Sequence, residues 1–284
     1  MKKIIILIIA AAMAVFADSA SAADFFGKRI KTTGQTVTET RTSAMKFDKI
    51  EVSRCVRLIV EKRTDGDIEI CTDKAVMPYV QLSVRNGIFK AKLSDKIKYV
   101  DGNSTIEVKI PDNGKIKYIG AYAVSSVTVK PRLEGKNIEL SASGASKIKA
   151  TVKAVKCEAD ASGASKLDIE YEGGEIGIDL SGASKGDFKL AALKSDIEVS
   201  GTSNLYATGT CTGVTIEASG ASKADIGSLK TEICDAEATG ASKISLNCSK
   251  SLSAEASGAS KIVYSGNCRL AVSSVSGASS ISNN

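Results

Sequence analysis

Charged side chains recur at a fixed distance from a repeated glycine in the second half of this sequence, and they are the residues most able to carry chemistry. In most repeats a lysine stands three residues after the glycine and an acid stands three residues before it. The lysines are Lys147, Lys166, Lys185, Lys223, Lys243 and Lys261, and the acids are Asp160, Asp179, Glu198, Glu217, Glu237 and Glu255. A row of lysines can bind a polyanion, whereas two carboxylates about 5 Å apart can serve as the acid and the nucleophile of a retaining glycosidase. The spacing therefore supports two hypotheses, a ligand-binding strip and an active site.

The composition favours the binding strip over the active site. The chain has no histidine and no tryptophan, and no long insertion between repeats would form the wall of a cleft. Because the recurring acids have equivalent surroundings in the sequence, nothing separates their pKa values as acid–base catalysis requires. No Cys/His cluster has the spacing of a metal site, and no glycine-rich phosphate loop precedes a helix. We therefore predict a protein that is not an enzyme and has no cofactor, with a carbohydrate-active enzyme as the remaining alternative.

The repeated glycine predicts the fold that positions these charges. It lies within Ser/Thr-Gly-Ala/Thr-Ser, and successive copies are 18 to 20 residues apart. A period of this size is typical of a solenoid, since each repeat must stack on its neighbours to bury its apolar face. We predict an all-β fold, a right-handed single-stranded parallel β-helix (β-solenoid) with about 19 residues per coil and a rise of about 4.8 Å. The glycines are Gly144, Gly163, Gly182, Gly201, Gly220, Gly240, Gly258 and Gly277.

Alternation of side chains predicts a narrow core of small apolar residues. Between Ile138 and Val152 every second residue is small or apolar, which places these residues on one face of an extended chain. Because 19 is odd, each coil needs one break in the alternation. We place the break at Lys153-Ala154, so that Val155 points inward again. The lysine and acid positions then point outward and stack into two parallel columns of opposite charge.

The seven cysteines leave at least one thiol unpaired. Cys157 and Cys234 have the same position in coils that are four repeats apart, which is about 19 Å at a rise of about 4.8 Å per coil. That distance is beyond the reach of a disulfide, so we expect both to be buried free thiols. Cys248 and Cys268 lie in adjacent coils and are the pair that we expect to be bridged.

The first 22 residues have the features of a cleaved secretory signal. Lys2 and Lys3 precede an apolar run of 13 residues that ends at Phe16, and Ala20-Ser21-Ala22 is a small-residue cleavage site. The run is shorter than the ~20 residues that span a bilayer. We therefore predict a signal peptide in residues 1–22 and an exported mature chain without a transmembrane segment.

The rest of the chain is predicted to form a leader and one domain. Residues 23–45 show little apolar patterning and are expected to be a leader or edge segment. Residues 46–284 are expected to be a single solenoid domain, with irregular N-terminal coils and a cap in 46–131 and eight repeats in 132–284. Within the first part, short alternating stretches predict strands at 50–52, 56–60, 67–70, 80–84, 88–93, 106–110 and 127–129.

The sequence resembles a known family of exported bacterial proteins, the putative auto-transporter adhesins with a head GIN domain. The resemblance covers roughly residues 47–284. It rests on Phe47-x-x-Ile50-x-Val52, Val84-x-x-Gly87-x-Phe89 and Ile106-x-Val108-x-Ile110-Pro111, followed by the Ser-Gly-Ala-Ser-Lys ladder. The resemblance implies a parallel β-helix and a role in adhesion, and it brings no reaction, ligand or catalytic residue.

These observations predict an exported, non-enzymatic cell-envelope or surface protein that acts as an adhesin or glycan-binding module. The alternative is a structural envelope solenoid without a dedicated ligand. The expected location is the periplasm, the outer-membrane surface or the medium. The expected partner is a polyanionic glycan, held by the lysine column, or another envelope or surface protein, and not a nucleic acid. Weak end-to-end self-association is also expected, because the C-terminal coil has no evident cap.

Overall fold

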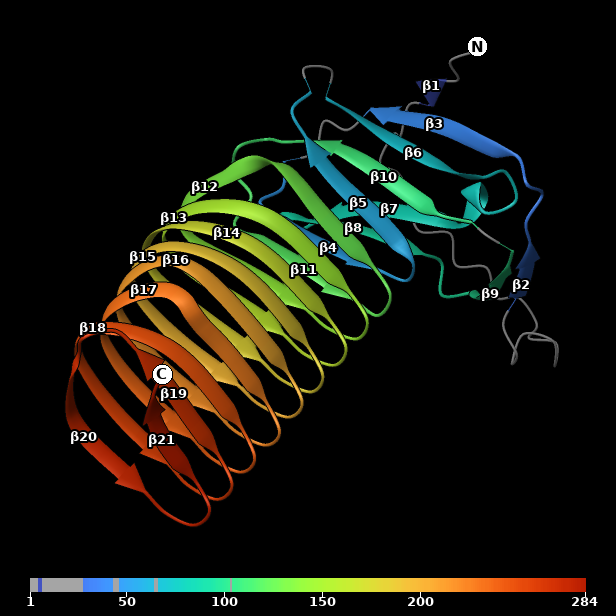
Figure 1. Ribbon diagram of the computed structural model, residues 1–284. Helices are drawn as coiled ribbons and strands as arrows, with labels where there is room; N and C mark the ends of the chain where they lie inside the picture. Colours follow the sequence, from blue (N-terminus) through green and yellow to red (C-terminus); the bar gives the residue numbers. More distant parts are fainter. Residues whose placement is uncertain (1–4, 7–27, 43–45, 64–65, 103) are drawn as a thin grey trace.

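The chain is a flattened β-solenoid with a cap of mixed strands at its N-terminal end (Figure 1). A computed structural model describes residues 5–6, 28–42, 46–63, 66–102 and 104–284. The predicted signal peptide therefore lies outside the described residues, except for the two-residue strand β1 (Ile5–Ile6), which pairs with β3 (Thr36–Thr42). The helical content of the described residues is one turn of 3-10 helix, Met77–Tyr79.

The solenoid proper comprises about nine turns of about 19 residues over residues 118–283, which confirms the predicted fold class. Each strand pairs in parallel with the equivalent strand of the preceding turn, so that Lys147 lies opposite Lys166 and Lys166 opposite Lys185. The strands are β11 (Tyr118–Tyr122), β12 (Ser126–Ala142), β13 (Lys147–Ala161), β14 (Lys166–Leu180), β15 (Lys185–Val199), β16 (Asn204–Ala218), β17 (Lys223–Ala238), β18 (Lys243–Ala256), β19 (Lys261–Ser265), β20 (Arg269–Val275) and β21 (Ser280–Asn283).

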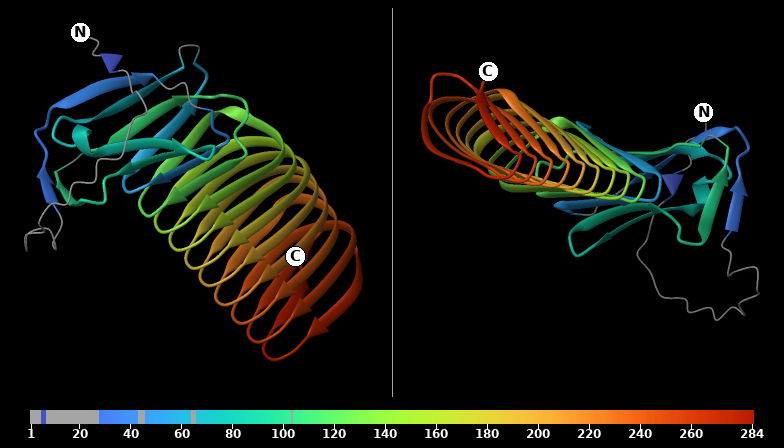
Figure 2. Two further views of the ribbon diagram at one scale, coloured as in Figure 1. Left: turned by 180° about the vertical axis from the view of Figure 1, so that it is seen from behind. Right: turned by 60° about the horizontal axis from the view of Figure 1, so that its bottom comes forward.

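Each long strand bends once, so that its two halves belong to two sheets that face each other across a thin core (Figure 2). In β14 the first half buries Leu167, Ile169 and Tyr171, and the second half buries Ile176 and Ile178. The other coils fill these positions mainly with Ile, Leu, Val, Ala and Cys. The two sheets therefore lie close together, as the small side chains of the sequence predict.

The bend itself lies two residues later than the sequence analysis places it. Ala154 is buried, whereas Val155 is 62% exposed and the following Lys156 is exposed as well. The prediction of an inward Val155 was therefore wrong. The same bend recurs two coils further on, where Ala192 is buried and Leu193 is 67% exposed, so the stacked register of the coils sets its place. Beside Val155, the hydroxyl of Tyr171 in the next coil lies 3.0 Å from the Ala154 carbonyl and 2.8 Å from the Glu175 carbonyl. This hydroxyl can donate a hydrogen bond to a carbonyl group at the corner of the coil.

The opposite edge of every coil is the turn at the repeated glycine. Gly163 has a φ of 71°, and a Cβ there would lie 2.7 Å from the carbonyl oxygen of Gly144 in the coil below. Glycine is thus required both for the backbone conformation and for the close approach. The Ala164 amide donates to that same Gly144 carbonyl at 2.7 Å. The buried hydroxyl of Ser165 completes the turn, 2.7 Å from the Ser162 carbonyl.

The cap at the N-terminal end combines parallel and antiparallel pairing. β4 and β5 continue the solenoid, since they pair in parallel with β11 and β12 above and with β8 and β10 below. Beyond them β7 runs antiparallel to β8, and β6 runs antiparallel to both β10 and β3. The strands are β2 (Lys28–Lys31), β4 (Lys49–Ser53), β5 (Val56–Glu61), β6 (Asp67–Asp73), β7 (Val80–Arg85), β8 (Ile88–Leu93), β9 (Ile97–Asp101) and β10 (Ile106–Pro111).

A buried carboxylate fixes the loop between β2 and β3. Asp73 accepts hydrogen bonds from the amides of Thr33, Gly34 and Ala75 and from the Thr33 hydroxyl, at 2.8–3.1 Å. Burial alone would raise the pKa of Asp73, but these donors outweigh it and hold the pKa below its ordinary value. The carboxylate therefore stays charged at neutral pH and holds the loop against the end of β6.

The seven cysteines are all free thiols. Cys157 and Cys234 are buried, as predicted, and burial raises the pKa of each thiol to about 12. The predicted bridge between Cys248 and Cys268 is not formed. Cys248 instead points into the core, where its thiol lies 3.1 Å from the Ser251 carbonyl, and Cys268 is half-buried beside it.

We predict that substitution of a turn glycine destabilises the solenoid much more than substitution of a strand glycine in the same coil. In Gly220→Ala the new Cβ would lie 2.8 Å from the Gly201 carbonyl at a φ of 73°, which should lower the free energy of unfolding by about 2 kcal/mol or more. The matched control is Gly227→Ala, where a Cβ meets only the Asp225 carboxylate at 3.5 Å. Equal midpoints of chemical unfolding for the two variants would contradict the role of the turn.

We also predict that thiol reactivity follows burial. Cys55 is exposed and should react with a thiol reagent in the folded protein at neutral pH, whereas Cys157 should react only after unfolding because its thiol is buried and protonated. Mass mapping of labelled peptides before and after denaturation distinguishes the two. Rapid labelling of Cys157 in the native protein would show that the core is open.

Candidate functional site

The lysine positions of the sequence form one continuous column on the surface. Lys147, Lys166 and Lys185 are in register, Asn204 follows, and Lys223, Lys243 and Lys261 continue the row. Lys166 is half-buried and pairs with Asp187, and Lys223 lies 3.9 Å from Asp225. The other four are exposed and have no ion pair within the described part of the chain: Lys147, Lys185, Lys243 and Lys261.

The acid positions form a second column, and neighbouring acids make it a broader acidic strip than the sequence predicts. Asp160, Asp179 and Glu198 are in register, and Glu217, Glu237 and Glu255 extend the row. A further row lies two residues earlier in the strands and includes Glu139, Glu158, Asp196 and Asp235. The side chains of this second row point outward because they lie two residues from the first row on the same strand face. Acids do not occupy this position in every coil.

The surroundings of the acids are not equivalent, contrary to the expectation from the sequence. Asp160 is exposed, yet the coils on both sides crowd its carboxylate. Burial raises the pKa of Asp160 to about 6, and the negative charges of Asp179, Glu158 and Glu139 act in the same direction. This carboxyl group therefore titrates near neutral pH, where an ordinary aspartate is fully ionised.

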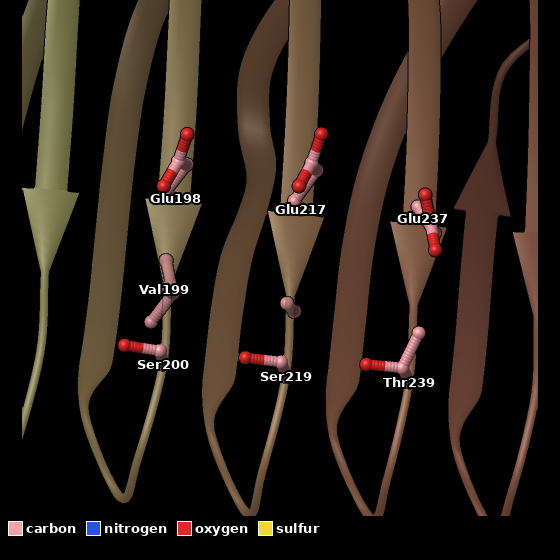
Figure 3. A pocket seen from close by; sticks show the side chains of 8 residues that line it. Glu198, Val199, Ser200, Glu217, Ser219, Glu237 and Thr239 are labelled. Atoms are coloured by element: carbon pink, nitrogen blue, oxygen red, sulfur yellow. The ribbon is translucent and has the colours of Figure 1, made fainter.

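The glycine turn separates the two charged columns and places them on opposite sheets of the flattened coil. An acid stands near the end of one sheet, the chain reverses at Ser-Gly-Ala-Ser, and the lysine begins the other sheet. Figure 3 shows Glu198, Glu217 and Glu237 in a row on the nearer strands, from which the chain turns toward the ribbons behind. The sequence predicts both columns, but it does not show that they face away from each other.

The solenoid therefore has an acidic face and a basic face. We define the acidic face as residues 137–142, 156–161, 175–180, 194–199, 213–218, 233–238 and 251–256, where Lys156 and Lys194 are the only basic residues. We define the basic face as residues 126–132, 147–153, 166–172, 185–191, 204–210, 223–230, 243–249 and 261–265. Its acids are mostly bound to its own lysines, as in Lys149–Asp168 at 2.9 Å and Lys153–Glu172 at 2.6 Å. Unpaired positive charge thus remains on this face.

The acidic face has one shallow hollow beside the turns (Figure 3). It has a volume of about 80 Å³, and Glu198, Glu217 and Glu237 line one side of it, while Ser200, Ser219 and Thr239 line the other. A hollow of this size holds only a few water molecules, and a monosaccharide does not fit in it. The acids that line it are successive members of one column, and each lies between two other acids of that column. The arrangement can attract a cation, but it does not enclose a substrate.

We predict that Asp160 makes the protein more stable as the pH falls from about 7 to about 5. The folded pKa of Asp160 lies near 6, above the ordinary value of about 3.9, so between these values the folded state binds a proton that the unfolded state does not. The stability should therefore fall as the pH rises through 6. Asp160→Asn should remove this dependence and raise the free energy of unfolding at pH 7, by about 1 kcal/mol at most because solvent screens the exposed carboxylate.

The control for Asp160 is Glu255→Gln, at the same position of a coil near the C-terminal end, where Ser274 replaces the next acid. Thermal unfolding of the three proteins between pH 5 and 8 gives the comparison. Identical pH profiles for the unsubstituted protein and Asp160→Asn would contradict the raised pKa.

The chain is similar to one protein family and to several solved structures. Residues 46–187 and 166–268 match the family described as putative auto-transporter adhesin, head GIN domain. A putative adhesin from Parabacteroides merdae superposes with a TM-score of 0.67 at 18% identity, over 90% of this chain and 99% of that one. A putative adhesin from Parabacteroides distasonis gives a TM-score of 0.68 at 16% identity, over 90% and 100%.

A third structure, described as a putative lipid binding protein from Parabacteroides distasonis, gives a TM-score of 0.63 at 16% identity, over 90% and 100% of the two chains. At these identities the structures establish a shared fold. No curated protein matches the sequence. In the described residues, no helix has the length and apolar character needed to cross a membrane.

Proposed function

Because the chain belongs to the family of putative auto-transporter adhesins with a head GIN domain, we propose that it is an exported, non-enzymatic surface protein that binds a polyanionic glycan through its basic face. The family description names adhesion, and it names no reaction. The observation that carries the proposal is the lysine column, in which four exposed lysines have no ion pair among the described residues. Export is proposed from the signal sequence in residues 1–22.

The spacing of the column suits a repeating ligand. Neighbouring strands of a sheet are about 4.8 Å apart, so the lysine ammonium groups recur at that interval and at its multiples. A polyanionic glycan carries carboxylates or sulfates at regular intervals along an extended chain. Such a ligand can contact several lysines at once without entering a cleft.

The energy of such binding comes from the number of contacts. One exposed ion pair contributes about 0–1 kcal/mol, too little for useful affinity. Several contacts from one ligand add, because the later ones form within the same complex. The acidic face repels the same ligand, so binding is restricted to one side of the solenoid. The expected binding is consequently moderate in affinity and strongly dependent on salt.

The alternative of a structural solenoid without a ligand rests on a different observation. Several ion pairs join adjacent coils, including Lys149–Asp168, Lys153–Glu172 and Lys250–Glu232. These pairs show that part of the surface charge serves the contact between coils. The unpaired members of the lysine column take part in no such pair within the described residues, and this supports the binding function.

We predict that replacement of the four unpaired lysines Lys147, Lys185, Lys243 and Lys261 with Gln abolishes binding to a sulfated glycan such as heparin and leaves the fold intact. Exposed charges each contribute within about 0.5 kcal/mol to stability, so the unfolding midpoint should change little. The matched control replaces Lys31, Lys74, Lys98 and Lys115 with Gln, which removes the same charge from exposed positions outside the solenoid face.

Retention on immobilised heparin across a salt gradient gives the readout. The control variant should elute close to the unsubstituted protein, and the column variant should elute much earlier. If both variants eluted equally early, the protein would be attracted to heparin by its net charge and not by a specific site. Unchanged binding in the column variant would contradict the proposed function.

A further inference from the structure

The coil at the C-terminal end of the solenoid exposes side chains from the core columns. Leu270 lies opposite Leu252, and Val275 lies opposite Ala256. Leu252 is fully buried and Ala256 is 3% exposed, whereas Leu270 is 38% and Val275 is 51% exposed. The same inward positions are thus buried in one coil and open in the next. Figure 1 shows β20 and β21 at this free end, next to the C-terminus.

The backbone of this coil is also paired on one side only. β20 pairs with β18, and β21 pairs with β19, and the register of the described residues gives neither strand a partner on its outer edge. Each strand therefore presents a row of unpaired N–H and C=O groups to solvent. Such an edge pairs readily with another strand unless charge or proline prevents it.

The charges that flank every earlier coil are missing here. Ser274 stands at the acid position and Ser280 at the lysine position. Between residues 262 and 284 the only charged side chain is that of Arg269. Repulsion therefore does not prevent the approach of a second edge of the same composition.

The opposite end of the molecule is closed in a different way. There the sheets end in antiparallel strands, and the outer strand β3 carries Glu39 and Arg41, which are half-buried and pair with each other at 2.8 Å. Charged residues on an outer strand are a common means by which proteins prevent edge pairing. The two ends are therefore not equivalent, and among the described residues the C-terminal end is the one that combines open backbone, exposed core residues and low charge.

We propose that the C-terminal coil is an interface with the same coil of a second copy of this chain, related by a two-fold axis perpendicular to the solenoid axis. The axis reverses the strand direction, so β20 lies antiparallel to β20 of the second copy, and β21 pairs likewise. Antiparallel pairing satisfies the open N–H and C=O groups of both edges. Arg269 begins β20, and so the two arginines lie at opposite ends of the paired strands.

A second copy fits this edge because it presents the same unpaired backbone groups, the same exposed Leu270 and Val275, and the same low charge. Leu270 and Val275 of one copy then cover the inward positions of the other, and the two cores become continuous. A two-fold contact of this kind closes on itself, so the assembly stops at a dimer. This inference does not depend on the proposed glycan-binding function, because the basic face stays open on both copies.

The test is the mass of the purified chain in solution as a function of concentration, measured by sedimentation equilibrium. The expected result is a reversible equilibrium between the 29.5 kDa chain and its dimer. Leu270→Lys combined with Val275→Lys places like charges at the interface and should raise the dimer dissociation constant at least tenfold. The matched control is Val155→Lys with Leu193→Lys, two apolar residues that are 62% and 67% exposed on the bend of the coils.

Amide hydrogen exchange of residues 269–275 gives a second readout that needs no substitution. Protection of these amides should increase with protein concentration, while residues in the middle of the solenoid keep constant protection. A chain that stays monomeric at high concentration would overturn the proposal. A dimer dissociation constant that does not change in the Leu270→Lys/Val275→Lys variant would also overturn it, as would an assembly of more than two copies.

Discussion

The close contact between backbone atoms of successive glycine turns is the constraint on which the rest of the solenoid depends. Each turn donates a hydrogen bond to the glycine carbonyl of the turn below, at 2.7–2.8 Å for Ala164 and Ala183. No side chain fits between the turns. The turns therefore stack directly above one another, and the strands that leave them have a common register. Every column of the structure, whether apolar, lysine or acidic, follows from that register.

The same turn explains why the charges divide between two faces. A tight reversal at the glycine leaves room for only a thin core, which small inward residues such as Ala159 and Ala161 fill. The acid three residues before the glycine and the lysine three residues after it must then lie on opposite sheets. The solenoid consequently has unpaired positive charge on one side and an excess of negative charge on the other.

Much of this architecture can be predicted from the sequence, because local period and parity are properties of the chain itself. The coils, the columns and the buried thiols of Cys157 and Cys234 follow from spacing alone. The outward position of Val155 could not be predicted, because alternation alone does not fix where in a coil the break falls; the bend has the same place in β15, where Leu193 is exposed. The turn at Ala123 could not be predicted either, because alanine there takes the place of the repeated glycine. Ala123 has a φ of 59° and lies one coil before Gly144. The opposite orientation of the charged columns also required the three-dimensional path of the turn.

Stacking between nearest neighbours leaves the number of coils unconstrained. Each coil touches only the one before and the one after, so a whole repeat can be gained or lost without change to the cap or to the C-terminal edge. A gene that duplicates one such unit would lengthen the protein by about 4.8 Å and add one more lysine to the row. If the lysine row binds a glycan as proposed, each added repeat would increase both the length of the solenoid and the number of contacts, so that longer relatives should stay bound at higher salt.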